Sequence, residues 1–213
     1  MKIVIFGATG FSGKMILSEA LSKHHQVVVL VRSKAAVKLQ NNNLTVIEGD
    51  VLNRQNVAQA LNNCDAVIQC LGVGGKGTGK PTTFISDATR IIVEEMEKQQ
   101  INRLVVMSNV GAGNSIAFLP WFFTRLVMPY FMKWLKVIID DKNRMESIIM
   151  NSRLNWTIVR FPNIVDKPEK GKVHITLDGK GLQISITLGD AAKLIVGQLD
   201  ETTYSRQAPS VSN

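Results

Sequence analysis

The chain has few of the residues that carry metal, disulfide or nucleophile chemistry. Its 213 residues include two cysteines and three histidines, and neither type has the spacing of metal ligands. Cys64 and Cys70 lie in or beside an apolar run, so we expect two reduced, buried thiols in a cytoplasmic protein. His24 and His25 stand at a predicted helix end and His174 stands alone, so we expect structural histidines and no bound metal.

Long apolar runs are also missing. A membrane-spanning helix needs about 20 nearly uninterrupted apolar residues. The most apolar segment, residues 116–139, is interrupted at five positions by Pro120, Arg125, Pro129, Lys133 and Lys136. At the N-terminus, Lys2 and four apolar residues precede a glycine-rich turn, which is too short for a signal peptide. We therefore expect neither a transmembrane segment nor a signal peptide.

Acidic residues are outnumbered, with 17 Asp and Glu against 25 Lys and Arg, which gives a formal net charge of +8. Such a charge can indicate nucleic-acid binding. Here, however, the cations are scattered along the chain, with no basic run and no interleaved aromatic residues. We expect no nucleic-acid partner, because small anionic ligands explain the charge at least as well.

Short β-branched apolar runs alternate with amphipathic stretches, which is typical of a mainly parallel sheet with helices on both faces. The pattern predicts strands over residues 2–6, 26–31, 44–48, 66–71, 104–108 and 156–160, and helices over 12–23, 55–61, 83–99 and 140–151. Later signals are weaker, with short strands at 172–177 and 183–187 and a helix at 190–199. The length suits a single doubly wound α/β domain spanning 1–213. We expect a core over 1–160, a small substrate-side part over 161–201 and a loosely held polar tail over 202–213.

A glycine-rich turn follows the first predicted strand and opens the first predicted helix. Its glycines have the spacing of a dinucleotide-binding loop, which allows a tight turn, close approach of a pyrophosphate and close packing of the helix. Backbone N–H groups and the positive end of the helix dipole then hold the anion. We therefore expect a Rossmann-like domain with a core of cofactor-binding residues in this loop: Gly7, Thr9, Gly10, Phe11, Ser12 and Gly13.

The end of the second strand indicates which dinucleotide is bound. Sites that prefer NAD usually carry Asp or Glu there to bind the ribose 2′-hydroxyl. This chain instead has Arg32, Ser33 and Lys34, and its next carboxylate is Glu48. A guanidinium pairs well with a 2′-phosphate, so the sequence predicts NADP(H). Residues at the next two strand ends complete the predicted site: Asp50, Val51, Leu71, Gly72 and Val73.

Taken together, these motifs resemble the atypical short-chain dehydrogenase/reductase superfamily, and within it the branch of the NADPH-dependent flavin and biliverdin-IXβ reductases. The resemblance covers nearly the whole chain, through residues 5–10, 29–32, 49–52, 65–68, 140–145 and 176–181. It implies that a loop beside the nicotinamide comprises Pro162, Asn163 and Ile164. It also implies a place for Lys142 in the cofactor site.

The chain departs from the usual catalytic pair of short-chain dehydrogenases, a Tyr four residues before a Lys. Tyr130 is followed by Lys133 at the wrong spacing, and Lys142 has Ile138 four residues before it. This argues against alcohol dehydrogenase or epimerase chemistry that depends on that pair.

The flavin reductase branch instead uses a serine after the fifth strand. Asn109 aligns with that serine, and Ser108 lies one residue earlier, where its side chain points the other way. Both residues are our candidate catalytic positions. The alternative for Ser108 is a serine that only caps backbone groups.

Residues 116–139 form a densely aromatic segment that looks longer than its counterpart in the family. Three roles are open: packing over the sheet end, a lid over a flat aromatic substrate, or a contact with a second copy or a membrane surface.

The sequence predicts an NADPH-dependent oxidoreductase that transfers hydride to a flavin or linear tetrapyrrole, acting as a monomer or weak homodimer. The alternative is a non-catalytic NADP(H)-binding sensor or assembly protein. An isomerase or epimerase of nucleotide-linked sugars fits less well, since the acid is missing and the chain is short for a sugar-nucleotide lobe.

Overall fold

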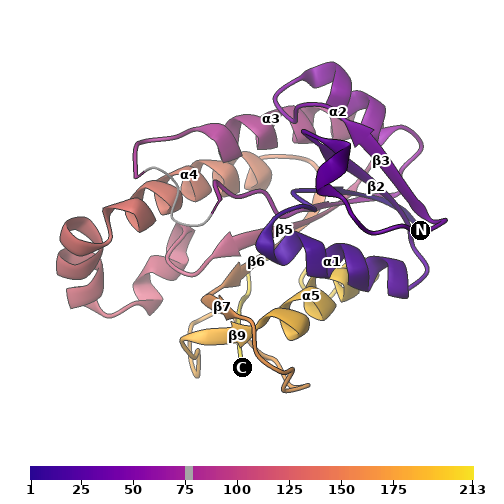
Figure 1. The fold of residues 1–213 in the computed structure, drawn as a ribbon. Coiled ribbons are helices and arrows are strands. Elements are labelled where there is room, and N and C mark those ends of the chain that lie inside the picture. The colour runs from indigo at the N-terminus through magenta and orange to yellow at the C-terminus, as the bar shows by residue number, and fades with distance from the viewer. Residues whose placement is uncertain (75–78) are drawn as a thin grey trace.

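The computed structural model describes residues 1–74 and 79–213 and contains an eight-stranded sheet (Figure 1). Across the sheet the order is β3 (Leu44–Glu48), β2 (Gln26–Val31), β1 (Lys2–Phe6), β4 (Ala66–Gln69), β5 (Arg103–Asn109), β6 (Asn155–Phe161), β10 (Ser210–Ser212) and β8 (His174–Thr176). Only β8 runs antiparallel to its described neighbour. A separate two-stranded sheet pairs β7 (Asn163–Val165) with β9 (Ser185–Thr187).

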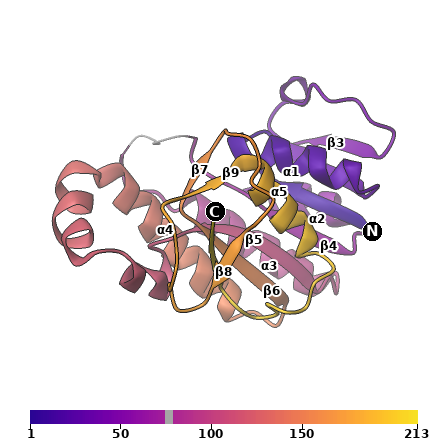
Figure 2. The same cartoon turned by 90° about the horizontal axis from the view of Figure 1, so that it is seen from below.

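Helices cover both faces of the large sheet (Figures 1 and 2). They are α1 (Phe11–Ser22), α2 (Arg54–Leu61), α3 (Phe84–Lys98), α4 (Lys133–Met150) and α5 (Leu188–Gly197), with the 3₁₀ turns η1 (Lys34–Ala36) and η2 (Gly113–Phe118) and the π-helix η3 (Phe123–Phe131). Side chains of β1 alternate between the two layers: Val4 and Phe6 face the core under α2, α3 and α4, whereas Ile3 and Ile5 face the core under α1 and α5. A strand buried on both faces explains the continuous apolar runs in the sequence.

The strand order reverses between β1 and β4, and β1 to β6 are parallel. Their carboxyl ends therefore meet at one edge, with a crevice at the reversal point where dinucleotides bind in this class of sheet. The prediction of a single Rossmann-like α/β domain is confirmed. The predicted strands at 172–177 and 183–187 are present as the shorter β8 and β9.

Helix α4 begins at Lys133, seven residues before the predicted start at 140. No proline or glycine stands between Pro129 and Asp140, and Leu135 and Ile139 continue its apolar side. The helix signal was therefore continuous from Lys133, although we predicted a helix only from residue 140. In the part of the chain that the structure describes, no helix is long and apolar enough to cross a membrane.

The prediction of a loosely held tail is wrong. Strand β10 lies between β6 and β8, and its Val211 is fully buried. The backbone N–H of Gln183 donates to the Ser212 hydroxyl over 2.9 Å, and the Asn213 side chain donates to Asp190 over 2.6 Å. The side chains of Ser212 and Asn213, which suggested a solvated tail, are thus hydrogen-bonded inside the protein, which composition alone does not show.

Candidate functional site

The glycine loop joins β1, β4 and α1 by contacts that only glycine permits. Gly7 has φ of +92°, and a Cβ there would lie 2.6 Å from the carbonyl oxygen of Cys70 at the end of β4. A Cβ on Gly13 would lie 2.0 Å from the carbonyl oxygen of Gly7. These two glycines therefore hold the start of α1 against the carboxyl ends of two strands. Cys70 itself is free and half-buried, and Cys64 is free and buried.

Gly10 plays a different part, because a Cβ there would approach only the Gly7 carbonyl oxygen, at 3.3 Å. Gly10 is the N-cap of α1 and provides no side-chain cap, and the first turn has no acidic residue. Among the described residues, none accepts a hydrogen bond from the backbone N–H of Phe11, Ser12 or Gly13. The N-terminus of α1 therefore presents unpaired donors, which is the arrangement that binds a pyrophosphate.

The end of β2 is exposed and mainly cationic. Arg32, Ser33 and Lys34 are all exposed. Glu48, at the end of β3, lies at the same corner, and its carboxylate accepts a hydrogen bond from the Lys34 backbone N–H over 2.9 Å. The corner thus also contains the carboxylate of Glu48, which the sequence analysis did not place beside Arg32, Ser33 and Lys34. Its position follows from the register that pairs Val31 with Glu48.

The residues that follow β3 and β4 form the next part of the predicted cofactor site. The Asp50 carboxylate accepts a hydrogen bond from the Leu52 N–H over 2.9 Å, which fixes the turn that contains the buried Val51. At the end of β4, Leu71 is buried and Val73 half-buried, whereas a Cβ added at Gly72 would meet nothing within 4 Å. The sequence is rich in glycine over residues 72–79, and this stretch lies partly outside the described residues, since 75–78 are not described.

Lys142 enters this edge from α4 and is almost completely buried. Its ammonium donates to the carbonyl oxygens of Leu71 (3.2 Å) and Met107 (2.8 Å), and it lies 3.8 Å from the Met145 sulfur. Burial lowers the pKa of the Lys142 ammonium to about 8. Lys142 thus joins the ends of β4 and β5, and protein atoms face all three of its N–H donors.

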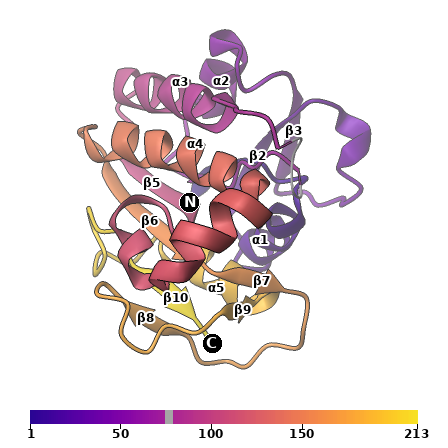
Figure 3. The same cartoon turned by 90° about the vertical axis from the view of Figure 1, so that its left-hand side faces the viewer.

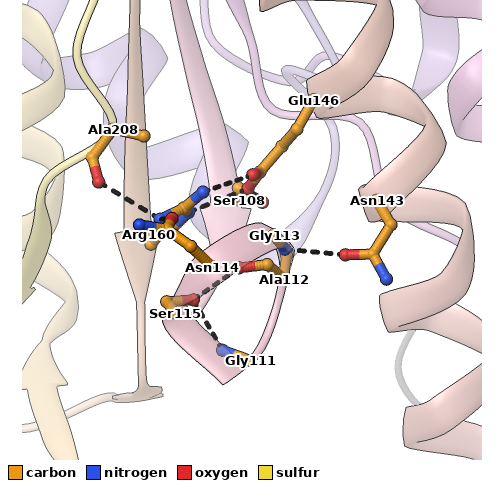
Figure 4. A network of polar contacts seen from close by, with 10 residues as sticks. All are labelled: Ser108, Gly111, Ala112, Gly113, Asn114, Ser115, Asn143, Glu146, Arg160 and Ala208. Atoms are coloured by element: carbon orange, nitrogen blue, oxygen red, sulfur yellow. Dashed lines mark hydrogen bonds and ion pairs between the residues drawn. The ribbon is translucent and has the colours of Figure 1, made fainter. Parts of the chain in front are cut away.

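Ser108 is also buried and hydrogen-bonded within the protein (Figure 4). Only 3% of its surface is exposed, and its hydroxyl donates to the Glu146 carboxylate over 2.6 Å. Glu146 in turn forms a buried two-point ion pair with Arg160, at 3.1 Å from Nε and 2.6 Å from Nη2. A carboxylate paired with a guanidinium accepts and does not donate, so Ser108 retains only acceptor capacity for a ligand.

The turn after β5 is tied to the same network. Arg160 Nη1 donates to Asn114 Oδ1 over 2.6 Å, and the Gly113 N–H donates to Asn143 Oδ1 over 2.7 Å. A Cβ on Gly113 would lie 2.4 Å from Arg160 Nη2. The network therefore fixes the position of residues 113–114 relative to β5 and α4, as Figure 4 shows.

Asn109, the last residue of β5, is half-buried, and its side chain makes no hydrogen bond within the described part of the chain. Pro162 and Ile164 are half-buried, and Asn163 is exposed. Asn163 and Ile164 belong to the strand β7 rather than to a loop. Of the two candidates at the end of β5, Asn109 is thus the one whose side-chain amide is available to hydrogen-bond a ligand. No group of three potential metal-binding residues occurs among the residues described.

Sequence reasoning missed Glu146, Arg160 and Asn114. Arg160 lies inside the apolar strand Asn155–Phe161, and a charge at such a position requires a buried partner. That signal was present in the sequence. The partner could not be read from it, because Glu146 lies on a different element.

These observations define the class of protein: a Rossmann-like dinucleotide-binding domain with an open helix N-terminus and a cationic corner at the carboxyl edge of its sheet. The model of the NAD(P)H-binding family matches residues 7–202, so the chain belongs to this family and is an NAD(P)H-binding domain of oxidoreductase-like fold.

Similar proteins agree with this assignment. The uncharacterized protein YwnB of Bacillus subtilis is 26% identical over 216 residues, which covers 97% of this chain and 96% of YwnB. The structure of ChuY, described as an anaerobillin reductase from Escherichia coli O157:H7, aligns with a TM-score of 0.79 at 22% identity and covers 100% of this chain and 97% of ChuY. A short-chain dehydrogenase/reductase of Veillonella parvula in complex with NADP aligns with a TM-score of 0.78 at 19% identity and covers 100% and 94% of the two chains. At these identities the structural likeness establishes the fold.

Proposed function

We propose that the protein is an NADPH-dependent reductase that transfers hydride to a flavin or a linear tetrapyrrole. The observation that carries the proposal is that no tyrosine-type proton donor lies at the end of β5 among the described residues. Ser108 donates to Glu146, Lys142 donates to backbone carbonyls, and Tyr130 is 70% exposed on η3. Chemistry that needs a tyrosine-type proton donor is not supported by such a site.

A flat conjugated acceptor requires less from the protein. Hydride arrives at an electron-poor centre, and the charge that develops is delocalised over the acceptor. Positioning against the nicotinamide and protons from solvent are then sufficient. The fold shared with ChuY supports the tetrapyrrole class of acceptor.

The direct experiment is to measure NADPH oxidation by the purified protein with FMN, riboflavin and biliverdin isomers. We expect turnover with at least one of them. Tight NADPH binding without turnover on any of these acceptors would instead support a non-catalytic sensor or assembly protein.

The cationic corner predicts a preference for NADPH over NADH. Each charge-assisted hydrogen bond from Arg32 to the 2′-phosphate contributes about 1.5–3 kcal/mol, so we expect the wild-type protein to bind NADPH about tenfold or more tightly. Calorimetric titration of both cofactors on the wild type and on Arg32→Ala tests this. Equal wild-type affinities would contradict the assignment, and a preference kept by Arg32→Ala would transfer the role to Ser33 or Lys34. A transfer of this role to Ser33 or Lys34 would leave the reductase proposal unaffected.

Asn109 is expected to position the nicotinamide or the acceptor with its free amide. Loss of one such hydrogen bond in Asn109→Ala should slow turnover about tenfold to a hundredfold, which corresponds to about 1–3 kcal/mol, with little change in NADPH affinity. Asn102→Ala is the matched control, because Asn102 lies just before the other end of β5 and bonds the backbone N–H of Asn155. Turnover that is equally insensitive to both changes would remove Asn109 from the site.

A further inference from the structure

The aromatic segment between η2 and α4 has an inner and an outer side. On the inner side, Phe118 lies against Gly179, Leu119 and Ile139 lie against Gly111, and Met128 is buried. The outer side contains five large residues that are at least half exposed: Trp121 (73%), Phe122 (50%), Leu126 (51%), Tyr130 (70%) and Phe131 (81%). Packing over the sheet therefore explains the inner residues and leaves the outer ones unexplained.

Local geometry aligns the outer residues. The π-helix η3 contains Pro129, which has no N–H to donate to an ordinary α-helical bond, and the Met132 N–H bonds back five residues to the Val127 carbonyl oxygen. In this wider turn, residues four or five apart lie on one side, as Phe122, Leu126 and Phe131 do. Figure 1 shows this part of the chain projecting at the left beyond the sheet, and in Figure 3 the same part faces the viewer. We call the exposed residues 121, 122, 126, 130 and 131 the outer face.

The segment that carries the outer face is cationic. Between Glu97 and Asp140 the sequence contains no acidic residue. Arg125 and Lys133 are exposed and make no ion pair within the described part of the chain, whereas Lys136 pairs with Asp140 over 2.7 Å. At least two unpaired cations therefore flank the exposed rings.

We propose that the outer face docks on the surface of an anionic lipid bilayer. Trp and Tyr rings favour the headgroup level, whereas Phe and Leu side chains favour the acyl boundary beneath it. The stems of Arg125 and Lys133 can lie along the apolar layer while their charged ends reach anionic headgroups. A second copy of the chain fits less well, because it would bring the same cations together on a protein of net charge +8.

Co-sedimentation of the NADPH-loaded protein with phosphatidylcholine vesicles, with and without phosphatidylglycerol, tests the proposal. We expect binding to the anionic vesicles only, and weakening by salt. Lys133→Glu should reduce vesicle affinity about tenfold or more, since each cation near such a surface contributes about fivefold and the substitution reverses the charge. Phe131→Ala should reduce it by about tenfold through lost apolar contact.

Matched controls separate this face from net charge and general hydrophobicity. Lys172→Glu changes the net charge equally at a remote exposed site, and Ile184→Ala removes a side chain that is 89% exposed elsewhere. Both should bind vesicles like the wild type, and stabilisation by NADPH should be unchanged in all four variants. Three results would overturn the proposal: no binding to anionic vesicles at low salt, equal binding to neutral vesicles, or equal losses in the controls. A concentration-dependent dimer that Phe131→Ala abolishes would assign the face to a second copy instead.

Discussion

Glu146→Ala should lower the free energy of unfolding by about 3–5 kcal/mol, because the substitution leaves the Arg160 guanidinium buried without its carboxylate. Both side chains are only 2% exposed, and Glu146 holds two nitrogens of Arg160 as well as the Ser108 hydroxyl. Asn114 and the Ala208 carbonyl, which also bond Arg160, cannot neutralise its charge. Chemical denaturation with urea measures the loss.

Two further variants test the physical reason for that loss. Asp140→Ala removes the carboxylate of an exposed ion pair on the same helix, and it should change the free energy of unfolding by less than about 1 kcal/mol. Replacing Glu146 and Arg160 together by methionine removes both charges, and this should restore much of the stability lost in Glu146→Ala. A loss below 1 kcal/mol in Glu146→Ala, or no recovery in the double variant, would show that the pair does not hold the end of β5.

The sequence predicted those parts of the fold whose signals are local. The strand at 2–6, the glycine spacing and the helix that follows are adjacent in the chain, so their geometry could be inferred from the glycine spacing and apolar periodicity. The mainly parallel sheet followed from the alternation of strands and helices. The same reasoning identified the open N-terminus of α1 through Gly10 and its neighbours.

The remaining features depend on pairing between distant segments. The contact of Glu48 with the Lys34 backbone requires the register of β2 and β3, and the tail strand requires an open edge on β6. The commitment of Ser108 to Glu146 joins residues 38 positions apart. Sequence periodicity predicts which face of an element is buried, but it does not say which polar group of another element meets it.

Gly10→Val should abolish measurable binding of NADPH while the domain remains folded. Gly10 has φ of −71° and ψ of 172°, an extended conformation that valine adopts without strain. The added Cβ would lie 3.3 Å from one protein atom, the Gly7 carbonyl oxygen, so a small shift of the loop is enough to accommodate it. The two methyl groups of the valine side chain would lie between the pyrophosphate and the N–H donors of α1. Losing two charge-assisted hydrogen bonds costs about 3–6 kcal/mol, which lowers affinity at least about a hundredfold.

Valine substitutions at two other glycines distinguish a loss of NADPH binding from a general loss of stability. A Cβ on Gly13 would lie 2.0 Å from the Gly7 carbonyl oxygen, so Gly13→Val should destabilise the domain even without cofactor. Gly197 has open space around it at the end of α5, so Gly197→Val should leave cofactor binding unchanged. Thermal unfolding with and without NADPH distinguishes the three variants. If NADPH stabilised Gly10→Val as much as the wild type, the dinucleotide would bind away from the N-terminus of α1, and the assignment of the pyrophosphate site to this loop would be wrong.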